Sequence, residues 1–208
     1  YTTKTFEYSV NATWNMTAER SIDGIPNGDV DVVPLSTTSE LIVNKTTKSL
    51  TYLNSTIDFL EFSSLEHAVV CRLSENKFAI CIESQIRLYS VDGTGFTLHD
   101  SADVKLIDGC VVCSSVSFLA WGDGAYLVNI DSNKISILLV TNTPVRAAIS
   151  LSSTSFMFFM NQKYDTILNT PKVTLLYSTV NGASVDNIEV YKTDVTSRFL
   201  NLCKLSDT

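Results

Sequence analysis

The chain has 208 residues, of which 45% are hydrophobic and 18% are charged, and its formal net charge is -7. This composition excludes a wholly disordered, collagen-like or low-complexity chain, because enough apolar side chains are present to form a core. No apolar run approaches the roughly 18 residues that a membrane-spanning helix needs, so no membrane span is expected. An acidic chain without a run of Lys or Arg also disfavours nucleic acid as the main ligand.

Short apolar or alternating runs, separated by Asn, Asp, Ser, Thr and Gly, predict strands and turns along most of the chain. Helical periodicity is nearly absent, so we predict an all-β protein. Short polar segments at 83–84 and 122–124 are typical of hairpin turns. Gly122 and Gly124, at the ends of the second segment, can take positive φ. Three hairpins are expected, pairing 38–43 with 49–54, 77–82 with 85–91, and 118–121 with 125–130.

Three segments depart from this regular pattern. Residues 17–34 are rich in Asp, Gly and Pro and are predicted to form an exposed loop. Residues 162–171 are predicted to be an insertion in the last hairpin. Residues 184–208 carry apolar side chains at mixed spacing, which predicts a closing strand or a strand followed by a short helix.

A repeat becomes visible when the second strands of the hairpins are superposed. Residues 6–11 (Phe-Glu-Tyr-Ser-Val-Asn) match 87–92 (Arg-Leu-Tyr-Ser-Val-Asp), 126–131 follow the same pattern, and 49–54 and 174–178 are looser copies. The equivalent positions 8, 51, 89, 128 and 177 are spaced by about 43, 38, 39 and 49 residues, close to the period of a four-stranded propeller blade.

At these residues the chain resembles a degenerate WD-repeat β-propeller. The run from Tyr89 to Asp92 stands where that family often has Trp-Asp, and only His67 hints at the Gly-His pair that precedes the first strand. The resemblance implies a β-propeller-like array of four-stranded antiparallel blades, about four or five of them over residues 1–183, in a partial ring. Residues 184–208 would supply the closing strand or short helix. A β-sandwich is the alternative architecture.

Few residues suggest catalysis or metal binding. Cys110 and Cys113 have C-x-x-C spacing, but no second pair exists, and the β-branched run around them predicts a strand rather than a redox or zinc site. His99 and Asp100 are adjacent, yet no nucleophile elbow or zinc-protease motif occurs, and an exposed turn is the simpler interpretation. We therefore expect a non-enzyme with no catalytic residues, no cofactor and no metal ion.

Four N-x-S/T sequons favour an alternative, a secreted or cell-surface β-rich glycoprotein that binds a receptor or carbohydrate. Their acceptors would be Asn11, Asn15, Asn44 and Asn54. A chain this rich in Asn, Ser and Thr contains several sequons by chance. The five cysteines, an odd number, also do not suggest a fully disulfide-bonded secreted scaffold.

The resemblance implies a non-catalytic function. A propeller offers wide docking surfaces, so we expect a protein–protein interaction scaffold that binds other subunits of a multisubunit intracellular assembly. The Ser/Thr/Asn-rich blades resemble those of fungal propeller subunits in nuclear complexes such as ribosome-biogenesis particles, which implies a nuclear, nucleolar or cytoplasmic location. Trp14 and Tyr164 are candidate partner contacts, because aromatic side chains contribute strongly to interfaces. A propeller hydrolase, with acids and His around a channel, is a third hypothesis.

Overall fold

All regular elements that the structure describes are β-strands, which confirms the all-β prediction. The computed structural model describes the backbone of residues 5–10, 16–22, 30–37, 39–53, 57–65, 67–82, 84–92, 95–165 and 170–193. These residues form one two-stranded sheet and four four-stranded sheets, and we call the four larger sheets the first to fourth blades.

The strands follow the chain order within every sheet. The small sheet pairs β1 (Thr5–Val10) with β2 (Met16–Ile22). The first blade contains β3 (Val30–Pro34), β4 (Glu40–Asn44), β5 (Ser49–Leu53) and β6 (Ile57–Glu61). The second contains β7 (Val69–Arg72), β8 (Lys77–Ile82), β9 (Gln85–Asp92) and β10 (Gly95–Asp103). The third contains β11 (Ile107–Ser114), β12 (Ser117–Gly122), β13 (Ala125–Asp131) and β14 (Lys134–Thr141), and the fourth contains β15 (Val145–Ser150), β16 (Ser155–Asp165), β17 (Thr170–Asn181) and β18 (Ser184–Thr193).

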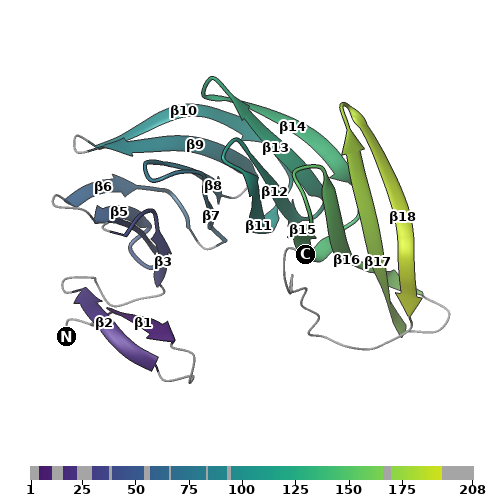
Figure 1. Ribbon diagram of the computed structural model, residues 1–208, viewed down its shortest axis with the longest axis horizontal. Helices are drawn as coiled ribbons and strands as arrows, with labels where there is room; N and C mark the ends of the chain where they lie inside the picture. The colour runs from purple at the N-terminus through teal and green to yellow at the C-terminus, as the bar shows by residue number, and fades with distance from the viewer. Residues whose placement is uncertain are drawn as a thin grey trace.

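The blades are antiparallel meanders that pack face to face along an arc (Figure 1). The first strands meet on the concave side, where β11 contacts both β7 and β15. The fourth strands meet on the convex side, where β10 contacts both β6 and β14. This is the propeller-like array of four-stranded blades that the repeat predicts.

In the second and third blades, the second strand is buried on both faces because a neighbouring blade covers each side. In β8, Phe78 and Ile80 pack toward the first blade, whereas Ala79 and Cys81 pack toward the third. Successive side chains of a strand point to opposite faces, so a strand between two layers needs apolar residues at every position. The nearly unbroken apolar run of β8 follows from this position.

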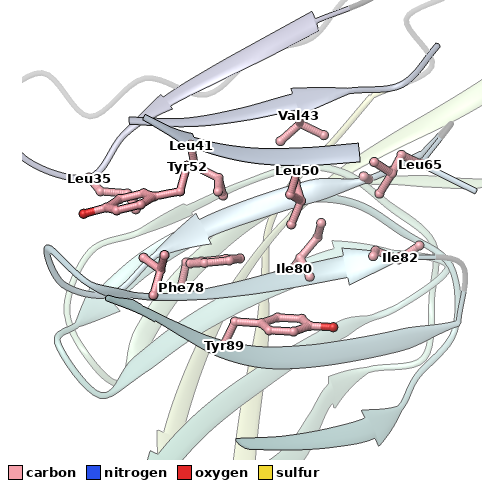
Figure 2. Packing of buried hydrophobic residues seen from close by; sticks show 12 residues of the cluster. Leu35, Leu41, Val43, Leu50, Tyr52, Leu65, Phe78, Ile80, Ile82 and Tyr89 are labelled. Carbon is pink, nitrogen blue, oxygen red and sulfur yellow. The ribbon is translucent and has the colours of Figure 1, made fainter. Parts of the chain in front are cut away.

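Three separate hydrophobic clusters lie between successive blades. The cluster between the first and second blades contains Leu41 and Leu50 from one side and Phe78 from the other (Figure 2). The ring of Phe78 is stacked on Tyr89 with centroids 5.7 Å apart, and Phe96 meets it edge-on at 6.1 Å. The second and third blades therefore each share one core with the blade before and another with the blade after, whereas the first and fourth blades each share one of these three cores.

The hairpins and the repeat register agree with the sequence-based prediction. The three expected hairpins are formed by β4 with β5, β8 with β9, and β12 with β13. The equivalent positions of the repeat, 51, 89, 128 and 177, all lie on the third strand of a blade. Position 8 lies on β1.

Three local expectations differ from the structure. Residues 17–34 are not one exposed loop, because β2 and β3 occupy most of the segment and Val30–Pro34 pairs with β4. Residues 162–171 extend a hairpin, since the ladder continues from β16 to β17 through Gln162 and Lys172. Gly122 and Gly124 are not among the described glycines with positive φ. Within residues 184–208, the described part is β18, which pairs with β17, and 194–208 lie outside the described residues.

Candidate functional site

The fourth blade has one face against the third blade and a second, outward face. On β16, Phe156 and Phe158 are buried in the core between the two blades, so Met157 and Phe159 lie on the outward side. The same alternation holds on β17, where buried Leu176 is followed by half-buried Tyr177. Apolar side chains of the outward face include Ala147, Ile149, Met157, Phe159, Leu175, Tyr177 and Ile188.

Backbone register arranges these side chains in a row across all four strands. Ile149 pairs with Met157, Met157 with Tyr177, and Tyr177 with Ile188. Ile188 is 60% exposed, the highest exposure among the large hydrophobic residues of the described chain. Directly opposed side chains lie close enough to contact one another, so the row forms a continuous apolar strip.

The opposite end of the array does not expose such a strip. On β4, Leu41 and Val43 face the second blade, which places Ile42 on the far side of the first blade. Ile42 is nevertheless only 2% exposed. Among the described side chains, the outward face of the fourth blade is therefore the end of the array where a row of half-buried apolar side chains reaches solvent at Ile188.

Polar groups lie beside Tyr177 at one margin of the strip. Hydrogen bonds with the hydroxyl groups of Ser155 and Thr179 hold the pKa of the Tyr177 phenol below its usual value, because they stabilise the phenolate. A phenol at an exposed apolar surface can contribute both area and a hydrogen bond to a partner.

Of the two residues expected to contact partners, the structure describes the backbone position of one. Trp14 lies outside the described residues. Tyr164 lies on β16, in the part of that strand where only the backbone is described. The outward face itself was not foreseen from the sequence. Its signal is the run Phe156 to Met160. This run is apolar at every position, although within the described residues its blade packs against one other blade.

One of the four sequon asparagines has a described position. Asn44 ends β4 and is 2% exposed, and its Oδ1 accepts a hydrogen bond from the backbone N–H of Thr47 at 2.9 Å. Its Nδ2, the atom that would carry a sugar, is buried. Attachment of a glycan at Asn44 would thus require this turn to open, and Asn11, Asn15 and Asn54 lie outside the described residues.

The C-x-x-C pair lies on a strand, as expected, and its two thiols face different interfaces. Cys110 packs against the core shared with the second blade and Cys113 against the core shared with the fourth. The pKa of the Cys71 thiol is raised mainly by a hydrogen bond with the Cys110 thiol and, to a smaller extent, by burial. Burial raises the pKa of the Cys81 and Cys113 thiols. The four described cysteines are free thiols.

His99 does not lie in an exposed turn, contrary to expectation, but at a bulge of β10, where it is half-buried. Its Nε2 is 2.8 Å from Ser90 Oγ. Asp100 does not orient the His99 ring. Its carboxylate instead accepts a hydrogen bond from the backbone N–H of Ile135 and lies 3.7 Å from Lys134 Nζ. The arrangement joins strands rather than orienting a general base.

Comparison with known proteins identifies no relative: no protein-family model matches the chain, and no curated protein matches it in sequence. In the described part of the chain, no helix has the length and apolar character needed to cross a membrane. No group of three or more His, Cys, Asp or Glu among these residues is placed to hold a metal ion.

Proposed function

We propose that this chain is a non-catalytic scaffold subunit that docks another protein on the outward face of its fourth blade. The observation that carries this proposal is the row from Ile149 to Ile188, an apolar strip across four strands that is half-buried at Ile149, Met157 and Tyr177 and exposed at Ile188. Exposed contiguous apolar strips on soluble domains mark sites of association.

The chemistry of the expected partner follows from the other interfaces of the array. Between each pair of successive blades, apolar side chains of two antiparallel sheets interdigitate. The outward face continues this series, so its complement is a partner protein that presents the apolar face of a β-sheet. A multisubunit assembly, nuclear in the setting that the WD-repeat resemblance implies, would provide such a partner.

The test compares two exposed sites on the full-length chain. Ile188→Asp places a charge in the strip, whereas Leu98→Asp places the same charge on β10, at a residue that is 52% exposed. Tagged wild-type and variant chains are purified from their native cells, and the accompanying proteins are quantified by mass spectrometry. Circular dichroism melting checks that both variants remain folded.

We expect a defined set of proteins to accompany the wild type and the Leu98 variant. Their recovery should fall about fivefold or more with the Ile188 variant, because a charge within an apolar contact must be desolvated. Equal recovery with both variants would place the docking surface elsewhere. A wild-type chain that copurifies with nothing would contradict the scaffold function itself.

A further inference from the structure

A cavity of about 440 Å³ lies where three successive blades meet. Its walls come from β3 and β4 of the first blade, the start of β7 in the second, and the start of β11 in the third. First strands line the concave side of the arc (Figure 1), so the cavity belongs to that side rather than to the outward face of the fourth blade. A volume in this range accommodates a small molecule or a protein side chain.

One part of the cavity wall is aliphatic, beside the polar groups of Asp31, Lys45, His67 and Asp108. Val69 and Val70 at the start of β7 are half-buried, and Ile107 at the start of β11 is 2% exposed. Valine and isoleucine side chains offer no hydrogen bond, so they favour an aliphatic part of a ligand over water.

The charged groups of the wall carry an excess of negative charge. Lys45 Nζ lies 2.9 Å from Asp31 Oδ2, so these two charges offset each other. Asp108 is a second carboxylate of the wall and is exposed. Within the described residues, no hydrogen bond or ion pair engages the Asp108 side chain. A cation at this point would therefore find a carboxylate that no neighbour already neutralises.

We infer that this cavity binds an aliphatic primary ammonium group, supplied either by a lysine side chain of a partner polypeptide or by a free alkylamine. The methylene groups lie along Val69 and Val70, and the ammonium lies beside Asp108. A lysine-type chain suits such a wall because its stem is apolar and only its end is charged. The chain's net charge of -7 adds long-range attraction for a cation.

The first experiment uses n-hexylammonium as the probe, with 1-hexanol and hexanoate as matched neutral and anionic chains. Amide chemical shifts of the full chain are followed by NMR during titration of each compound. Hexylammonium is expected to perturb the amides of Val69, Val70, Ile107 and Asp108 in a saturable manner. Hexanol or hexanoate shifting the same amides to the same extent at the same concentration would overturn the proposal, because binding would then not depend on the ammonium.

The second experiment tests the role of the carboxylate. Asp108→Asn keeps the shape of the side chain and removes its charge, and the matched control Asp186→Asn removes an exposed charge on β18. We expect the Asp108 variant to bind hexylammonium about fivefold more weakly, the size of one partly solvated ion pair, and the Asp186 variant to bind as the wild type does. Equal weakening in both variants would show a general charge effect and overturn the assignment.

The two possible sources of the ammonium group are separated with a capped Gly-Lys-Gly peptide. Saturable shifts at the same amides at lower concentration than hexylammonium indicate a lysine side chain as the ligand. Binding of hexylammonium without binding of the peptide indicates a free amine. Either result supports the ammonium site, and failure of both probes would remove it without affecting the docking function proposed for the fourth blade.

Discussion

The Asp100 carboxylate on β10 accepts a hydrogen bond from the backbone N–H of Ile135 on β14 at 2.9 Å. A second polar link joins the same two blades, since Lys77 Nζ donates to Asn133 Oδ1 at 2.6 Å. Burial of apolar side chains is not directional, so it does not by itself fix how one blade slides along the next. These two directed contacts select one alignment of the second and third blades.

The link at Asp100 predicts a loss of stability in acid. The N–H of Ile135, with smaller contributions from the N–H of Ser101 and from Lys134, lowers the pKa of Asp100 from its ordinary value of 3.8. A carboxylate whose pKa is depressed in the folded state contributes stability that is present above its unfolded-state pKa and is lost as pH falls through the folded-state pKa. Urea unfolding should therefore show that Asp100→Asn is less stable than the wild type at pH 7 and that the difference narrows below about pH 4.

The control for this effect is Asp123→Asn, at an exposed turn residue. Its stability should run parallel to that of the wild type from pH 7 to pH 3. If the difference in the free energy of unfolding between wild type and the Asp100 variant stayed constant from pH 7 to pH 3, the charge of Asp100 would not be what stabilises the contact with Ile135.

A steric prediction concerns the tight approach between β12 and the start of the third blade. A Cβ at Gly122 would lie 2.2 Å from the backbone oxygen of Leu106 and 2.9 Å from the backbone nitrogen of Asp108. Neither atom can move without shifting the β-ladder, so Gly122→Ala should lower the free energy of unfolding by about 2–4 kcal/mol in urea titrations. Gly182→Asn is the matched variant: Gly182 has φ of +62°, a region that Asn tolerates, and a Cβ there meets nothing within 4 Å. The idea fails if both variants unfold at the same urea concentration.

The repeat was predictable because its signals are local. Turn residues and alternating apolar positions recur in each blade, and this is enough to place Thr51, Tyr89, Val128 and Tyr177 on third strands. The strand Val30–Pro34 was missed because the Asp, Gly and Pro of its neighbourhood outweigh a short β-branched run.

The functional surfaces were not predictable in the same way. Both depend on which blade faces which, a property of residues far apart in the chain. Apolar residues at every position from Phe156 to Met160 of β16 indicate a strand with two covered faces, and only the arrangement of blades reveals that no other described blade packs on the outward face. Asp108 and Lys45 likewise become neighbours of one cavity only because three blades converge there. Gly122 shows the same limit, since it is needed for a close approach rather than for the positive φ that a turn glycine suggests.

The two buried thiols, Cys71 and Cys81, should be protected from modification in the native protein. Burial and the thiol–thiol hydrogen bond raise the pKa of Cys71, and burial raises that of Cys81, so neither forms much thiolate near neutral pH. At pH 7.5 we expect both to react with a disulfide reagent more than about a hundredfold more slowly in buffer than in guanidinium, where reaction no longer requires opening of the fold. Peptide mapping after a timed pulse of alkylating reagent measures each site separately. Rapid labelling of Cys71 or Cys81 in buffer would contradict their burial.

The final prediction concerns how far a defect in one core spreads through the array. Phe78 is fully buried and lies against Tyr89 and Phe96, so Phe78→Ala should destabilise the first and second blades by about 3–5 kcal/mol. The core between the third and fourth blades, which contains Phe156 and Phe158, shares no residue with the core around Phe78.

Arrays of this kind, in which each unit contacts only its neighbours, can lose one end while the other remains folded. Amide hydrogen exchange should therefore accelerate at Leu41 and Ile80 in the Phe78 variant while the amides of Phe156 and Phe158 keep most of their protection. Phe158→Ala is the reciprocal variant and should show the reverse pattern. Equal acceleration at all four amides in either variant would mean that the blades unfold as one cooperative unit, in which case the second blade transmits the defect through the core that contains Ala79 and Cys81.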